Sequence, residues 1–68
     1  MTLTAAQAKP VLRKVEFSVH FPMASLIKAF PSVTFQKGMV NGGVTVEYTL
    51  TGPTVWVDKI ERKYAYGA

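Results

Sequence analysis

The chain has 68 residues with no cysteine and one histidine, which leaves room for a single domain and excludes disulfide bonds. A domain of this length buries only about 60% of the surface that its unfolded chain would expose, so its core contributes about 3–5 kcal/mol of net stability. The net charge of +4 and the isoelectric point of about 9.7 favour contact with nucleic acid, an anionic membrane or an acidic protein surface.

No segment reaches the ~18 apolar residues that a membrane-spanning helix needs. Residues 1–10 also lack the basic start and long apolar run of a signal peptide, so we expect a cytoplasmic localisation by default. Thr4 and Gln7 have the spacing of a capping box, but Pro10 follows too soon for a stable helix. Residues 1–10 are therefore predicted to form a flexible N-terminal arm, and residues 11–68 a single small β-rich domain.

Residues 11–21 have the alternating pattern of a half-buried strand. Apolar and polar side chains alternate strictly from Val15 to Phe21, which is the period-2 signature of a strand with one face on the core.

Residues 22–31 predict a short helix. Pro22 is well tolerated at a helix start and Pro31 ends the segment. The apolar residues between them recur at helical spacing: Met23, Leu26, Ile27 and Phe30. Two turns are not stable alone, so this helix is expected to lie on the sheet.

Residues 33–50 predict a β-hairpin around Asn41–Gly42, the strongest short hairpin signal. A two-residue loop there places Met39 opposite Val44 and Phe35 opposite Tyr48, with the apolar faces of both strands on one side.

The C-terminal segment is expected to add another strand after a turn at residues 51–54. Val55 and Val57 continue the apolar face of the sheet, but Ile60 fits only if a β-bulge near Asp58–Lys59 inserts one residue. The strand would then run to about Tyr64 or Tyr66.

The expected fold class is therefore α+β, with a mainly antiparallel four-stranded sheet formed by a strand, a short helix and a three-stranded meander. The alternative is a small, partly closed β-barrel in which residues 22–31 form a connecting turn.

Catalytic and metal-binding chemistry is not expected. His20 lies on a predicted strand with no obvious nucleophile partner, and the four carboxylates Glu16, Glu47, Asp58 and Glu61 are best explained by cross-strand pairing with lysines. The spacing of the glycines does not match a phosphate-binding loop. We therefore predict a protein that is not an enzyme, with no cofactor, no metal and no small-molecule substrate.

Trp56 is the most informative single residue. In the predicted sheet it points away from Val55 and Val57, onto the face with Thr45 and Thr49. It is either covered by the arm or a subunit, or available to a ligand, as tryptophans in binding hot spots are. The candidate binding surface comprises Trp56, His20, Lys14, Lys59, Arg62, Lys63, Tyr64 and Tyr66.

Two functions fit this pattern. The first is a small interaction or assembly module, of the kind found among accessory and structural proteins including viral ones, which presents a sheet face or edge to a protein partner or to copies of itself. The second is a basic β-sheet domain that binds RNA or single-stranded DNA by stacking bases on Trp56 beside lysines. The mixed basic and aromatic residues 59–66 fit either the second function or a solvated edge strand protected by lysines.

Overall fold

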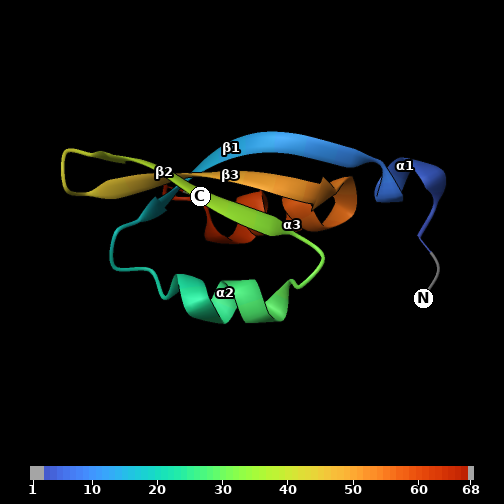
Figure 1. Ribbon diagram of the computed structural model, residues 1–68, viewed down its shortest axis with the longest axis horizontal. Helices are drawn as coiled ribbons and strands as arrows, with labels where there is room; N and C mark the ends of the chain where they lie inside the picture. The colour runs from blue at the N-terminus through green and yellow to red at the C-terminus, as the bar shows by residue number, and fades with distance from the viewer. Residues whose placement is uncertain (1–2, 68) are drawn as a thin grey trace.

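The computed structural model describes residues 3–67. Six elements follow one another along the chain (Figure 1): α1 (Ala5–Ala8), β1 (Pro10–Ser18), α2 (Met23–Ala29), β2 (Thr34–Asn41), β3 (Thr45–Pro53) and α3 (Thr54–Tyr64). The three strands form one antiparallel sheet in the order β1-β3-β2, so β3 is central and the other two strands are its edges.

Several local predictions are confirmed. The strand predicted at 11–21 forms as β1, although it ends at Ser18 where a turn begins. The helix predicted at 22–31 forms as α2, with Leu26 buried and Ile27 exposed, so the apolar stripe is narrower than expected. The capping box of Thr4 and Gln7 is also present. It begins the single-turn helix α1, however, which was not expected because Pro10 follows so closely.

The turn of the β2–β3 hairpin lies one residue later than predicted. Gly42 and Gly43 have φ angles of 59° and 71°, which is the pattern of a type I′ turn. The Val44 N–H donates to the Asn41 carbonyl oxygen over 3.1 Å. The two central residues of the turn are therefore Gly42 and Gly43 and not Asn41 and Gly42. Glycine adopts a positive φ without the steric cost that other residues incur.

The predicted strand register of the hairpin is also wrong. Phe35 pairs with Leu50 and not with Tyr48, and the register shifts between Lys37 and Val40. This shift is a bulge in which Gly38 and Met39 face the single residue Glu47. A side chain at Gly38 would place its Cβ only 2.9 Å from the Glu47 carbonyl oxygen, so the close approach of the two strands requires glycine there.

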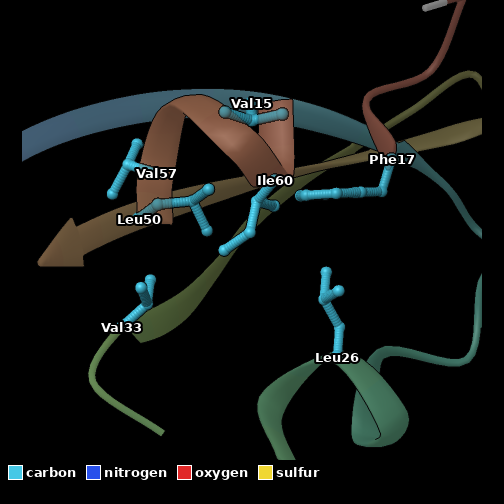
Figure 2. Close-up of a cluster of buried hydrophobic side chains, with 7 residues drawn as sticks. All are labelled: Val15, Phe17, Leu26, Val33, Leu50, Val57 and Ile60. Carbon is cyan, nitrogen blue, oxygen red and sulfur yellow. The ribbon is translucent and has the colours of Figure 1, made fainter. Parts of the chain in front are cut away.

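The core lies between one face of the sheet and the helices α2 and α3, which both lie below the strands in Figure 1. Figure 2 shows side chains from all these elements converging: Val15, Phe17, Leu26, Val33, Leu50, Val57 and Ile60. Burying each of the larger ones contributes about 1.5–3 kcal/mol relative to exposure. The opposite face of the sheet carries the alternate residues of the strands, among them Leu12, Lys14 and Glu16, which are exposed.

The four-stranded sheet predicted from the sequence is wrong, and so is the closed barrel. Residues 54–64 form the helix α3 and not a strand, and no bulge exists at Asp58–Lys59. Val57, Ile60 and Tyr64 recur at i, i+3 and i+7, and this helical spacing places Val57 and Ile60 in the core with no exposed surface. The break in alternation after Val57 was therefore the sign of a helix.

Candidate functional site

The end of the β2–β3 hairpin extends beyond both α2 and α3, at the left of Figure 1. Three of the six exposed large hydrophobic side chains in residues 3–67 gather on it: Met39, Val40 and Val44. Met39 is 71% exposed and Val44 is 54% exposed. We call these three residues the hairpin-end surface. Exposed apolar side chains that lie near one another at the end of a hairpin are candidates for an interaction site.

A groove of about 330 Å³ lies beneath the hairpin-end surface, on the helix side of the sheet. Val46 and Tyr48 of β3 line it together with Val40 of β2, and Phe21 and Met23 contribute from the start of α2. Of the hairpin-end surface, Val40 is therefore the residue that lines this groove, whose lining also includes the polar residues Ser18 and Lys37.

The two edges of the sheet differ in what covers them. Beside β1, the Tyr66 N–H donates to the Glu16 carbonyl oxygen over 2.7 Å, so the segment after α3 occupies part of that edge. Along β2, residues 36–40 are all exposed, and Lys37 is the only charged residue of the strand. The edge of β2 is therefore the more accessible one for pairing with another strand.

A second groove lies between the end of α2 and α3. We call it the α2–α3 groove; its volume is about 410 Å³, and its lining consists of Ala29, Phe30, Pro31, Ser32, Trp56 and Lys59. Trp56 is half-buried, and its ring centroid lies 6.3 Å from that of Phe30. The Lys59 amine lies over the indole, 5.9 Å from the centroid, within range of a cation–π interaction.

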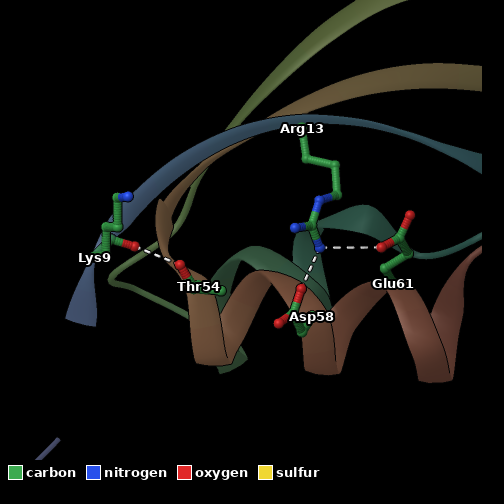
Figure 3. A network of polar contacts seen from close by, with 5 residues as sticks. All are labelled: Lys9, Arg13, Thr54, Asp58 and Glu61. Carbon is green, nitrogen blue, oxygen red and sulfur yellow. Dashed lines mark hydrogen bonds and ion pairs between the residues drawn. The ribbon is translucent and has the colours of Figure 1, made fainter. Parts of the chain in front are cut away.

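The two carboxylates of α3 point to its other side, toward β1 (Figure 3). The Arg13 guanidinium forms ion pairs with Asp58 and with Glu61, the latter over 3.1 Å. The hydrogen bond that the Arg13 guanidinium donates to the Asp58 carboxylate, ahead of the contribution of Glu61, holds the pKa of Arg13 above its usual value. These ion pairs tie α3 to β1. At the start of α3, the Thr54 N–H and hydroxyl both donate hydrogen bonds to the Lys9 carbonyl oxygen.

The structure brings together only part of the predicted binding surface. Trp56, Lys59, Lys63 and Tyr64 lie on α3, where the Lys63 amine is 5.6 Å from the Tyr64 ring centroid. Tyr64 is half-buried and packs edge-on against Phe21.

The remaining predicted residues are dispersed. Lys14 is exposed on the helix-free face of the sheet, His20 is exposed in the turn after β1, and Arg62 is exposed on α3. Tyr66 follows α3 and is 57% exposed.

The aromatic platform predicted on the polar face of the sheet does not exist. Trp56 belongs to a helix that packs on the opposite face from Thr49, so it does not share a surface with the strand threonines. The reading of residues 59–66 as an edge strand is wrong for the same reason, since α3 extends to Tyr64.

The hairpin-end surface was not predicted from the sequence. The predicted register placed Met39 opposite Val44 on the core side of the sheet, whereas the bulge and the shifted turn leave both exposed. The sequence did contain a signal for this surface. Val40 and Val44 flank the glycine-rich turn, and no charged residue lies between Lys37 and Glu47.

Two glutamates lie on the helix-free face of the sheet, Glu16 on the edge strand β1 and Glu47 on the central strand β3. Glu16 pairs directly with Glu47 across β1 and β3, and the Glu16 carboxylate accepts a hydrogen bond of 2.8 Å from the Thr45 hydroxyl. Across residues 3–67, no group of three or more histidine, cysteine, aspartate or glutamate side chains is placed to hold a metal ion. Glu16 and Glu47 therefore place two like charges at directly opposite positions of neighbouring strands.

In the part of the chain that the structure describes, no helix is both long enough and apolar enough to cross a membrane. Comparisons with protein-family models, with curated proteins and with solved structures find no match for this chain.

Proposed function

We propose that this protein is a non-catalytic interaction module that presents the free edge of β2 and the hairpin-end surface to a protein partner, which is a second copy of the chain or a different protein. The observation that carries the proposal is the exposure of the apolar side chains of Met39, Val40 and Val44 at the end of the β2–β3 hairpin, which extends beyond α2 and α3 (Figure 1). The small size of the core supports it, since domains of this length commonly gain stability from a partner.

Strand addition is the mode of binding that this surface suits best. An extended segment that pairs with the edge of β2 would gain main-chain hydrogen bonds. Its alternate side chains would point to the helix side of the sheet, where Val40, Val46 and Tyr48 line the groove beneath the hairpin. Apolar contacts in that groove would supply specificity, because partly enclosed apolar pockets are where binding energy concentrates.

A pair of matched variants tests the proposal. Met39→Ser combined with Val44→Ser removes the two most exposed apolar side chains of the hairpin-end surface, whereas Leu12→Ser removes one that is 70% exposed on the helix-free face. Sedimentation equilibrium over a wide concentration range measures self-association. Selection from a peptide library displayed on phage measures binding of extended segments.

We expect the wild-type chain to self-associate or to select apolar peptides, and the double variant to lose this behaviour while Leu12→Ser keeps it. A wild-type chain that stays monomeric and selects no peptide would contradict the proposal. Equal losses in the double variant and in Leu12→Ser would contradict it as well, because they would show nonspecific apolar adhesion.

A further inference from the structure

The helix α3 keeps its two acidic residues away from the α2–α3 groove. Asp58 and Glu61 are engaged by Arg13 on the side that faces β1 (Figure 3). Of the three cations of α3, Arg62 lies near Asp58, whereas Lys59 lines the groove. Lys63 follows Lys59 one helical turn later, on the same side of α3. Among residues 3–67, the ion pairs of α3 are those of Arg13, so the groove side carries positive charge that no carboxylate of the described chain neutralises.

The α2–α3 groove combines this charge with an apolar interior. Phe30 and Trp56 form its aromatic part, and Ala29 and Pro31 contribute small apolar surface. Its volume of about 410 Å³ lies in the lower part of the range for ligand pockets. Such a groove accepts an apolar side chain, while Lys59 in its lining and Lys63 one helical turn later attract negative charge.

We propose that the α2–α3 groove binds an acidic peptide segment of a protein partner, with one apolar side chain of that segment packed in the groove against the Phe30–Trp56 pair. Lys59 and Lys63 then bind the carboxylates that flank this side chain. The charge of the groove supplies the complementarity, because both of the acidic residues on α3 are already paired on its other side. This site is separate from the hairpin-end surface and goes beyond the function proposed above.

A nucleic acid suits the groove less well than an acidic peptide. Trp56 is half-buried and the Lys59 amine lies over its ring. A stacked base would therefore have to displace that amine, whereas single-stranded nucleic acids bind to aromatic rings with an open face. An apolar side chain fills the groove without this displacement.

The single tryptophan provides the measurement, because Trp56 itself lines the groove. The probe is a short synthetic peptide of glutamate and aspartate with a central phenylalanine, added at low and at moderate salt while the fluorescence of Trp56 is recorded. The comparison ligands are the same peptide with glutamine and asparagine in place of the acids, and an oligothymidylate of equal charge.

Two double variants with the same change in net charge provide the control. Lys59→Gln with Lys63→Gln removes the cations beside the groove, and Lys9→Gln with Lys14→Gln removes two exposed cations at β1. We expect the acidic peptide to bind the wild-type chain, and we expect this binding to weaken as the salt concentration rises. The groove variant should bind about tenfold more weakly, as expected for the loss of two surface charge interactions, and the β1 variant should bind nearly as well as wild type.

Three outcomes would overturn the inference: no change in Trp56 fluorescence with the acidic peptide, equal losses in the two double variants, or tighter binding of the oligothymidylate than of the peptide at the same salt. The last outcome would assign the groove to single-stranded nucleic acid. The variant Met39→Ser with Val44→Ser should still bind the acidic peptide, so failure here is distinguishable from failure of the hairpin-end surface.

Discussion

The two ends of the sheet differ in how they are covered. At one end, α3 lies across β1 and β3 and excludes solvent from Phe17, Leu50 and Ile60, which have no exposed surface. At the other end, β2 and the turn that joins it to β3 extend past the helices, and Met39 and Val44 are more than half exposed. The sheet thus passes from a region covered by helices to an uncovered one.

This difference indicates how local stability varies along the sheet of a very small domain. Residues that open easily are those with few buried apolar contacts, and the hairpin end fits that description whereas the α3 end does not. Substitutions at the α3 end should therefore change the free energy of unfolding strongly, and substitutions at the hairpin end should change it little.

The largest expected effect is at the covered end. Leu50→Ala should lower the free energy of unfolding by about 2–5 kcal/mol, because it leaves a cavity in a fully buried position. Val44→Ala should change it by less than about 0.5 kcal/mol, since its side chain is mostly exposed. Thermal or denaturant unfolding followed by circular dichroism measures both free energies of unfolding. Similar losses in the two variants would contradict the difference in stability between the two ends.

The turn should be sensitive through its backbone alone. Gly42→Ala should cost about 1–2 kcal/mol, because residues with a Cβ are disfavoured at the φ of 59° found there. No other atom lies within 4 Å of the Cβ position, so packing does not contribute. Gly42→Asn is the matched control, since asparagine tolerates this conformation better; if it cost as much as alanine, the turn geometry would not be the cause.

The ion pairs of Arg13 should contribute less. Arg13→Gln should lower the free energy of unfolding by about 0.5–1 kcal/mol, a small value because the pairs are one-third to one-half exposed and therefore screened by solvent. The difference from wild type should shrink in high salt. Arg62→Gln is the control, because Arg62 is exposed on α3 and forms no ion pair with another of the described residues. An equal loss there would show that Arg13 acts through net charge alone.

The smallest expected effect has the opposite sign. Glu47→Gln should raise the free energy of unfolding by about 0.2–0.5 kcal/mol, because it removes the like charge opposite Glu16. Glu61→Gln should instead lower it, since it removes an ion pair with Arg13. Denaturant titrations at low salt resolve the two signs, and a destabilised Glu47→Gln variant would mean that this carboxylate has a favourable contact.

Strand β1, helix α2 and the hairpin could be predicted from the sequence because each depends on local chemistry. Strict alternation around Val15, the helical stripe beginning at Met23 and the glycine-rich turn each favour one conformation within a few residues. The candidate site was predicted less well. Trp56, Lys59, Lys63 and Tyr64 were named, but on the wrong element and the wrong face of the sheet.

The tertiary structure determined the rest, above all residues 54–64. Val55, Trp56 and Val57 favour a strand by propensity, while Val57, Ile60 and Tyr64 favour a helix by spacing, so the segment by itself is compatible with both. Only the sheet selects between them, because the two turns of α2 are too short to cover its apolar face, and α3 completes that cover by burying Val57 and Ile60 against β1 and β3. The bulge at Gly38 likewise depends on the approach of Glu47 from the neighbouring strand, which the local sequence does not specify.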